Sequence, residues 1–360
     1  MLSSAQRPAP VWLMSSGMDR ITFLAELLGH PTTRRWAGRQ PAAVAGWGVK
    51  DSGQKAIKLA VRLGVPCWRL EDGFLRSFGT GDHFPPLSLV VDDLGIYYDS
   101  TRPSALEALL ESPAEVLAGM ADDVARAKAL MLAHRLSKYN HAPDHEQPGH
   151  CERSEAIHAV GSHGLPRFAR NDSGGRVLVI DQTAGDMSVL LGGASADTFA
   201  AMLAAARAEN PQATIYVKTH PEVSAGRKNG YLAHVQDEIL DGQRTVVLRQ
   251  AINPLSLIGH MDRVYVVTST MGFEALLAGK PVSVFGIPWY AGWGATDDRQ
   301  TCARRTRQRS VNELFAAAYF HYARYLNPVT HQRGTIFDVI EWLVRQRAMA
   351  GGHLYVSGVA

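Results

Sequence analysis

The 360-residue sequence has few cysteines, no long apolar run and little net charge. Cys67, Cys151 and Cys302 are far apart and match no metal-ligand spacing, which is typical of a reducing compartment and argues against a disulfide framework. No apolar stretch is long enough to cross a bilayer. Residues 1–10 lack a charged leader followed by an apolar core. We therefore expect a cytoplasmic protein and disfavour a periplasmic binding protein.

The charge pattern and the glycine pattern argue against further classes of protein function. The net charge of +3 is not gathered into long basic runs, so we expect no nucleic-acid partner. A local cluster holds Arg304, Arg305, Arg307 and Arg309, and we favour a solvated face there over a site for an anionic acceptor or a lipid head group. No glycine-rich dinucleotide fingerprint or Walker-type loop is present. Nicotinamide-dependent dehydrogenases and P-loop enzymes are therefore disfavoured.

Strand-like and helix-like segments alternate along the chain, which predicts parallel strands joined by crossover helices. In the first half we expect strands at 11–14, 42–46 and 67–70, an extended segment at 87–98, and helices at 19–29, 54–63 and 103–136, the last broken near Pro113. In the second half we expect strands at 177–180, 214–217, 245–248, 264–267 and 282–285, and helices at 197–209, 271–278, 311–325 and 335–347. The prediction is an α/β protein with two Rossmann-like, doubly wound domains and a substrate cleft between them.

The expected domain boundaries follow from this alternation. Residues 1–140 form the N-terminal domain, 176–309 form the second, and the helices of 310–360 pack across both. Residues 141–175 have no sustained apolar periodicity and read as an inserted loop or disordered linker. Parts of this segment resemble translated copies of a bacterial interspersed repeat element. Its histidines and its cysteine match no common zinc pattern, so we expect no metal site.

Polar side chains follow two of the predicted strands. Asp186 comes shortly after strand 177–180 and is our leading candidate for a nucleophile, although a loop aspartate ordinarily caps a helix or closes a turn. Lys218 and His220 stand at the end of strand 214–217, where each can donate to phosphate oxygens. The alternative for this pair is an exposed lysine and an isolated loop histidine.

A third strand is followed by the hydroxyl-bearing run Thr268, Ser269 and Thr270. This run offers hydroxyls and backbone amides at a helix start, which favours an anion and is also compatible with a simple N-cap. Glu274 lies one place beyond the capping-box spacing, so it either accepts hydrogen bonds from ribose hydroxyls or complements the helix dipole. Phosphate and sugar recognition at strand ends of two similar domains is the layout of a nucleotide-sugar-dependent glycosyltransferase.

Seven short motifs carry a family resemblance that runs in order over nearly the whole chain, apart from the insertion and the first few residues. Together they resemble the capsule polysaccharide biosynthesis proteins of the KpsC type. The motifs are Glu71-Asp-Gly-Phe-Leu-Arg-Ser77, Pro86-Leu-Ser-Leu-Val90, Gly95-Ile-Tyr-Tyr-Asp99, Gln182-Thr-Ala-Gly-Asp-Met-Ser188, Lys218-Thr-His-Pro221, Gly272-Phe-Glu-Ala-Leu-Leu-Ala-Gly-Lys-Pro281 and Trp289-Tyr-Ala-Gly-Trp-Gly294.

The resemblance implies a GT-B-like fold and a retaining transferase that moves β-Kdo from CMP-Kdo to a lysophosphatidylglycerol-linked acceptor. It implies an acceptor-side first domain, a CMP-sugar-binding second domain, and Asp186 as the nucleophile of a covalent intermediate. Lys218 and His220 would offset charge on the leaving phosphate. The other expected substrate contacts are Gln182, Ser188, Thr268, Ser269, Thr270 and Glu274, and Arg76 for the acceptor or the Kdo carboxylate.

No cofactor or metal is expected besides the donor, because CMP leaves with its own low-pKa phosphate and the adjacent Asp297 and Asp298 read as a loop. The lipid-linked acceptor implies peripheral contact with the cytoplasmic face of the inner membrane, and capsule assembly or export proteins as partners. The well-known family enzymes carry two catalytic modules and this chain carries one, which leaves open whether it makes one linkage or two. A non-catalytic assembly or export component that binds the glycolipid terminus is the alternative.

Overall fold

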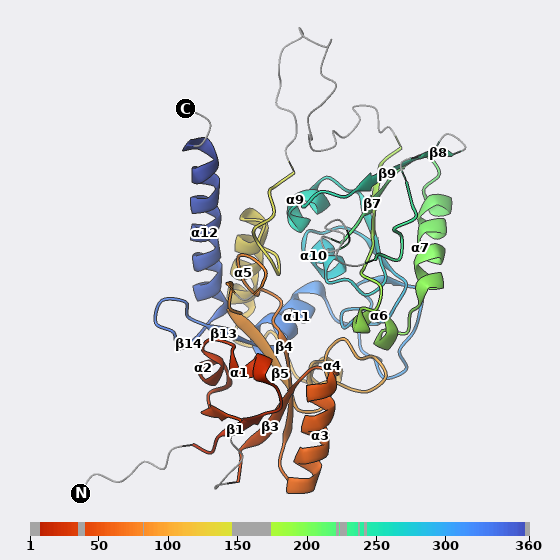
Figure 1. Ribbon diagram of the computed structural model, residues 1–360. Helices are drawn as coiled ribbons and strands as arrows, with labels where there is room; N and C mark the ends of the chain where they lie inside the picture. The colour runs from red at the N-terminus through yellow and green to blue at the C-terminus, as the bar shows by residue number, and fades with distance from the viewer. Residues whose placement is uncertain are drawn as a thin grey trace, which may run out of the picture. The chain divides into compact units, whose positions relative to one another are not determined.

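The computed structural model describes residues 8–34, 40–81, 83–145, 174–220, 223, 229–236, 238–240 and 243–356. The chain divides into two compact units, shown in Figure 1. The first comprises Met1–His141, Trp293–Ala295 and Cys302–Ala360, and the second comprises Ala142–Gly292 and Thr296–Thr301. Each unit is built around its own sheet.

The sheet of the first unit has the strand order β14-β13-β5-β4-β3-β1-β2. Strands β2, β1, β3 and β4 are parallel, whereas β5, β13 and β14 pair antiparallel at the other side. The strands are β1 (Val11–Leu13), β2 (Thr32–Thr33), β3 (Ala43–Trp47), β4 (Cys67–Asp72), β5 (Ser88–Asp92), β13 (Ala323–Leu326) and β14 (Arg333–Gly334).

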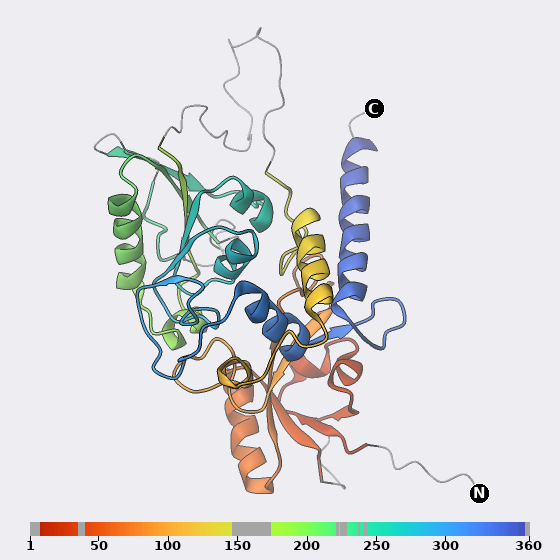
Figure 2. The same cartoon turned by 180° about the vertical axis from the view of Figure 1, so that it is seen from behind.

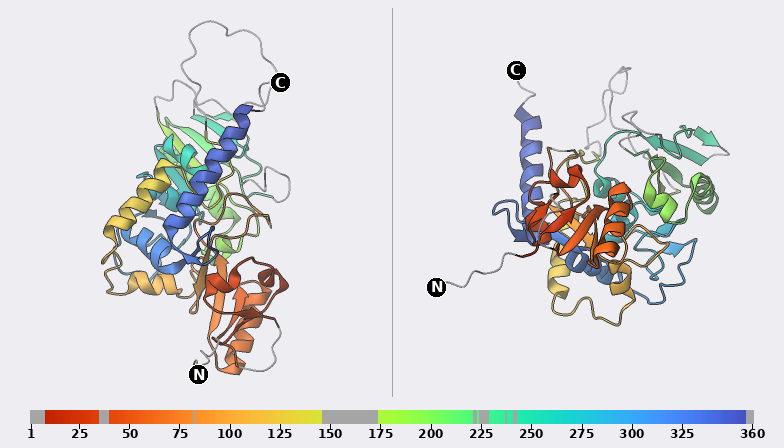
Figure 3. Two further views of the ribbon diagram at one scale, coloured as in Figure 1. Left: turned by 90° about the vertical axis from the view of Figure 1, so that its left-hand side faces the viewer. Right: turned by 60° about the horizontal axis from the view of Figure 1, so that its bottom comes forward.

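Helices of the first unit pack on this sheet and on one another. Helix α3 packs against β3 and β4, as the orange ribbon in Figure 3 shows, and α12 packs against α5 and β13, which is clearest in Figure 2. The helices are α1 (Ser16–Asp19), α2 (Leu24–Leu28), α3 (Asp51–Leu63), α4 (Ala105–Glu111), α5 (Ala121–Ala133), α11 (Val311–Phe315), the π-helix η1 (Ala316–Tyr322) and α12 (Ile336–Val356).

The sheet of the second unit has the order β12-β11-β10-β6-β7-β9-β8 and is parallel except for the β8–β9 pair. Because β10, β6 and β7 are parallel neighbours, the loops that follow them leave the same edge of the sheet. The strands are β6 (Arg176–Ile180), β7 (Thr214–Lys218), β8 (Glu238–Leu240), β9 (Gln243–Leu248), β10 (Arg263–Val266), β11 (Val282–Val284) and β12 (Asp297–Asp298).

An apolar core lies beneath the second sheet. Phe199 of α7, Ile215 of β7 and Tyr265 of β10 belong to one cluster of buried side chains, so this helix and these strands form a single packed layer pair. Helix α10 packs against β10, β11 and α9. The helices are α6 (Met187–Leu191), α7 (Ala196–Glu209), α9 (Pro254–Gly259) and α10 (Met271–Leu277).

The predicted α/β class with two sheets is confirmed, and several boundaries differ. The helix expected at 19–29 is two short helices, because Phe23 adopts a left-handed conformation with φ 61° between them. The extended segment at 87–98 ends as a strand at Asp92, whose carboxylate accepts the N–H groups of Leu94 and Gly95 and so forms a turn. These changes come from local side-chain and backbone hydrogen bonding.

The C-terminal region also differs from the expectation. The helix expected at 311–325 is a short α-helix and a π-helix that give way to strand β13, which pairs with β5. The helix expected at 335–347 continues to Val356. Asp297 and Asp298, expected in a loop, form the edge strand β12 beside β11. Pairing with distant strands explains both new strands.

Most of the segment expected as an insertion, residues 146–173, lies outside the described residues. His145 is described, and its ring packs edge-on against His260 at 5.3 Å between centroids. Within the described ranges, no helix is both long and apolar enough to cross a membrane.

The arginine cluster is not a solvated face. Glu107 of α4, 6% exposed, accepts from Arg304 Nε at 2.6 Å and from Arg305 Nε at 3.0 Å. The Arg305 side chain is only 2% exposed, and Arg309 is buried with its Nε donating to the carbonyl of Leu110 at 2.8 Å. The solvated-face prediction is therefore wrong for Arg305 and Arg309, whereas Arg307 is exposed as expected. The same contacts explain why residues 302–309 group with the first unit, whereas the sequence boundaries place them with the second.

Removing Glu107 tests this buried ion cluster. Glu107→Ala leaves the Arg305 guanidinium buried without its carboxylate, and we expect a loss of about 3–5 kcal/mol in the free energy of unfolding of the first unit. Urea denaturation measures it. Glu341→Ala is the control, because the Glu341–Arg345 pair is exposed and is expected to contribute less than about 1 kcal/mol. If Glu107→Ala and Glu341→Ala lost the same free energy of unfolding, Glu107 would not be the centre of a buried ion cluster.

Candidate functional site

The loop after β6 carries the predicted nucleophile. Asp186 is half-buried at the N-cap of α6, where its Oδ1 accepts the backbone N–H of Ser188 at 2.9 Å. Gly185, with φ 82°, supplies the left-handed turn that places Asp186 at the helix start. Asp186 therefore caps a helix, as loop aspartates ordinarily do, and presents its second oxygen to the neighbouring side chains.

Gln182 connects this loop to the loop after β10. It is 5% exposed, and its Oε1 accepts the backbone N–H of Thr268 at 3.0 Å while its Nε2 lies 3.0 Å from Thr268 Oγ1. The same Nε2 lies 3.5 Å from Asp186 Oδ2 and 3.4 Å from Ser188 Oγ. Ser188 Oγ and Thr268 Oγ1 are 3.2 Å apart. The structure thus brings together four of the predicted site residues, from loops 86 positions apart in the sequence.

Lys218 ends β7, the strand next to β6, and is buried rather than exposed. Its side chain is at 5% exposure and its Nζ donates to the carbonyl of Thr219 at 2.7 Å. Burial lowers the pKa of Lys218 to about 8. A phosphate bound at this edge of the sheet would favour the charged form of Lys218 and so raise its pKa again.

His220 follows two residues later and is partly exposed, with its carbonyl accepting the N–H of Val223 at 2.9 Å. Its proposed contact with a leaving phosphate stays a prediction.

The start of α10 holds the remaining hydroxyls. Ser269 Oγ accepts the N–H of Met271 at 3.3 Å, whereas the Thr270 side chain makes no capping hydrogen bond at the N-cap. The carbonyl of Ser269 accepts the Tyr290 hydroxyl at 2.5 Å. Glu274 is in the first turn of α10 and is 4% exposed. A buried carboxylate at a helix N-terminus is compatible with both roles considered for Glu274.

Sequence reasoning missed Asp181, the first residue after β6. Asp181 is 2% exposed, and its Oδ1 accepts the N–H groups of Gln182 at 2.9 Å and Leu232 at 3.1 Å. Burial raises the pKa of its carboxyl group, an effect that these donors oppose. Asp181 therefore ties the start of the loop after β6 to the segment around Gly230, which also bridges Thr183. The sequence signal that could have identified Asp181 is a carboxylate directly after an apolar strand.

The first unit has a second polar cluster at the carboxyl ends of β3 and β4. Trp47 Nε1 donates to Glu71 Oε1 at 3.1 Å, and the Tyr98 hydroxyl accepts the N–H of Val49 at 3.3 Å beside the same carboxylate. Burial raises the pKa of Glu71, and the nearby Lys138 ammonium opposes this shift. Glu71 begins the motif Glu71–Ser77 and is not among the site residues predicted from the sequence.

Arg76 belongs to this first-unit region and already has partners. Its Nε lies 2.8 Å from Asp72 Oδ1, and its Nη1 donates to Ser77 Oγ and to the carbonyl of Phe84, each at 2.9 Å. The proposed contact of Arg76 with an acceptor or a Kdo carboxylate stays a prediction, and the structure gives its guanidinium a positioning role within the loop.

The sequence model of the family described as "Capsule polysaccharide biosynthesis protein" matches residues 42–327. The chain belongs to this family. It is 43% identical over 363 residues to the capsule polysaccharide modification protein LipA of Neisseria meningitidis serogroup A, covering 97% of this chain and 48% of LipA. The chain thus spans about half the length of this relative.

Two solved structures share the fold. The Thermosulfurimonas dismutans structure titled KpsC, beta Kdo 2,4 transferase has 45% identity and a TM-score of 0.79, covering 93% of this chain and 98% of that one. The structure titled KpsC, beta Kdo 2,7 transferase has 25% identity and a TM-score of 0.64, covering 95% and 100%. The predicted KpsC-type membership and two-domain GT-B-like fold are confirmed. The roles of individual residues stay predictions.

Gln182→Ala tests the connection between the two loops. It removes the acceptor of the buried Thr268 N–H, and we expect a loss of about 1–3 kcal/mol in the free energy of unfolding of the second unit, measured with urea. The exposed Gln250 of the same unit provides the control variant Gln250→Ala, for which we expect a change within about 0.5 kcal/mol. A Gln182→Ala protein as stable as wild type would show that the link is dispensable.

Proposed function

We propose that this chain is a single-module glycosyltransferase that transfers Kdo from CMP-Kdo to a glycolipid acceptor with retention of configuration. The main support is the position of Asp186, which Gln182 joins to Thr268 at the carboxyl edge of β6 and β10. Ligands of open α/β sheets collect at this edge. The titles of the two similar KpsC structures supply the sugar and the reaction class.

The reaction takes place in two displacements. Asp186 attacks the anomeric carbon of Kdo as the bond to the CMP phosphate breaks, and the bonding electron pair leaves with CMP. The acceptor hydroxyl then attacks the same carbon and passes its proton to water, as the bond to Asp186 breaks and its carboxylate is released. Two inversions give net retention. The hydrogen bond from Ser188 N–H to Oδ1 fixes the orientation of the carboxylate at the start of α6.

Lys218 and His220 act on the leaving group in this proposal. A buried ammonium beside the phosphate stabilises negative charge more than an exposed one, because water does not screen it. Thr268, Ser269, Thr270 and Glu274 hold the nucleotide and the sugar at the start of α10. The CMP phosphate needs no protonation to leave, so the proposal requires no metal or further cofactor.

The comparisons also favour one of two glycosidic linkages. Identity is 45% to the structure titled 2,4 transferase and 25% to the one titled 2,7 transferase, so we propose that this chain forms the 2,4 linkage. Its partners would be a lipid-linked saccharide, at the cytoplasmic face of the inner membrane, and capsule assembly or export proteins. A non-catalytic relative that only binds the glycolipid would release no CMP, which separates the two functions in one assay.

Asp186→Asn is the direct test of activity. Purified protein is incubated with CMP-Kdo and a synthetic Kdo-terminated acceptor, and CMP release and product are quantified. We expect transfer by the wild type and a fall of at least about 10³-fold in the variant, because the nucleophile is lost. Binding of CMP should persist, since the asparagine oxygen can still accept the N–H of Ser188 and cap α6.

Asp197→Asn is the matched control for that experiment. Asp197 is an exposed carboxylate in the first turn of α7, so it shares the helix-terminus position of Asp186 without the Gln182 contact. Its activity should equal that of wild type. Full activity of Asp186→Asn would reject the nucleophile assignment, and a wild type that turns over no CMP-Kdo would reject the transferase.

Lys218 predicts a pH dependence. Its pKa of about 8 means that the ammonium is present below pH 8 and is lost as the pH rises above it, so affinity for CMP should fall severalfold across that range. Isothermal titration calorimetry with CMP measures the change, and cytidine, which has no phosphate, should show none. Lys218→Met should bind CMP weakly at every pH. A variant with the wild-type affinity and profile would contradict the phosphate contact.

A further inference from the structure

A pocket of about 750 Å³ opens within the first unit, at the carboxyl ends of β1 and β3. Its position is set by topology. The order β2-β1-β3-β4 makes β1 and β3 the neighbours from which the chain winds in opposite directions, which is the switch point where open α/β sheets bind ligands. The volume falls in the range of small-molecule sites. None of the roles proposed above uses this pocket.

The pocket has one fixed aromatic wall. Trp47 is held at both ends, because its backbone N–H donates to Ser52 Oγ at 3.1 Å and its indole N–H donates to Glu71 Oε1 at 3.1 Å. The start of α3 also lies unusually close to β3, since a Cβ on Gly46 would come within 2.3 Å of the Ser52 carbonyl oxygen. The wall is therefore preorganised for a ligand.

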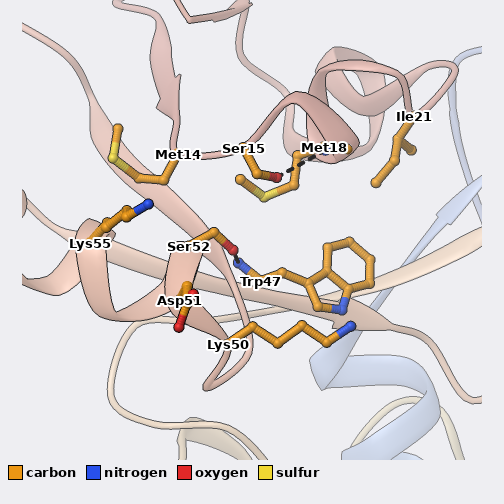
Figure 4. A pocket seen from close by; sticks show the side chains of 10 residues that line it. Met14, Ser15, Met18, Ile21, Trp47, Lys50, Asp51, Ser52 and Lys55 are labelled. Carbon is orange, nitrogen blue, oxygen red and sulfur yellow. Dashed lines mark hydrogen bonds between the residues drawn. The ribbon is translucent and has the colours of Figure 1, made fainter.

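The lining combines apolar and cationic groups. Figure 4 shows Met18 and Ile21 on one side of Trp47 and Lys50 on the other, with Lys55 farther along α3. Both lysines are exposed and free to move toward a ligand. Asp51 is the acidic residue among the lining residues, so the lysines leave a net positive charge. Ser15 and Ser52 add hydroxyls.

This composition favours a carboxylated sugar. The C–H face of a sugar packs on an aromatic ring and thioethers, its hydroxyls pair with serines, and its carboxylate pairs with lysines. A dinucleotide is disfavoured because the loop after β1 lacks the glycine-rich fingerprint. A divalent metal is disfavoured by a lining with a single carboxylate.

We propose that this pocket binds the terminal carboxylated sugar of the acceptor, with Lys50 and Lys55 pairing with its carboxylate and Trp47 covering its apolar face. The identity of the ligand as the acceptor rests on the proposed function. The preference for an anionic sugar rests on the pocket alone. Glu71, which fixes Trp47 from behind, connects this pocket to the polar cluster at the end of β4.

Equilibrium binding without a donor tests the pocket by itself. The probes are the methyl β-glycoside of Kdo and its methyl ester, which differ only in the carboxylate charge, and calorimetry measures both. Wild type should bind the acid at least about tenfold more tightly than the ester. The double variant Lys50→Ala, Lys55→Ala should bind the acid as weakly as the ester.

Lys58→Ala is the matched control, because Lys58 is an exposed lysine of the same helix that does not line the pocket. It should bind both probes as wild type does. Equal binding of acid and ester by wild type, or unchanged binding of the acid by the double variant, would overturn the proposal. Displacement of the acid by equimolar inorganic phosphate or by lysophosphatidylglycerol would also overturn it, in favour of a simple anion site or a lipid site.

The transfer assay separates this proposal from the proposed function. The double variant should raise the acceptor KM at least about tenfold while the affinity for CMP stays at its wild-type value. A wild type that binds the acid selectively but transfers nothing would refute the transferase and leave the sugar site. An active enzyme whose acceptor KM is unchanged in the double variant would refute the pocket and leave the transferase.

Discussion

Gln182 is the interaction on which the arrangement of the second unit's site depends. One buried amide satisfies the backbone N–H of Thr268 and contacts its hydroxyl, and it approaches the carboxylate of Asp186. Because β10 and β6 are parallel neighbours, their loops leave the same edge of the sheet, and this amide together with the Ser188–Thr268 contact holds the two loops at a fixed spacing. The amide thereby connects two adjacent loops and the carboxylate of Asp186 in one hydrogen-bonded group.

The polar side chains around this group of residues are buried, and burial strengthens their electrostatic interactions. Lys218, Asp181 and Glu274 are each 5% exposed or less. Water screens their charges little, so an ammonium at the end of β7 interacts strongly with an anion, and its own pKa is already lowered to about 8. In the first unit, buried charges stabilise the fold and exposed charges line the pocket. Glu107 pairs with Arg304 and Arg305 in a structural cluster, whereas the lysines that line the switch-point pocket are exposed.

The sequence predicted the parts of the structure that depend on local pattern. Strands such as β6 and β7 are short apolar runs with polar ends, so their positions and the edge that carries Asp186 and Lys218 could be read directly. Contacts between residues far apart in the sequence could not be predicted in this way. The burial of Arg305 depends on Glu107, 198 positions away, and β13 is a strand only because β5 lies beside it. Asp181 could have been noticed as a carboxylate directly after an apolar strand, but its contact with Leu232 and the contact of Trp47 with Glu71 depend on the fold.

The central claim is that Asp186 carries a transient covalent Kdo. Intact-mass spectrometry of the protein incubated with CMP-Kdo in the absence of acceptor tests it most directly, followed by peptide mapping of the modified species. The account predicts an adduct of one Kdo on the peptide that contains Asp186, absent from Asp186→Asn and discharged when acceptor is added. An adduct on another residue, or rapid turnover by Asp186→Asn, would contradict it.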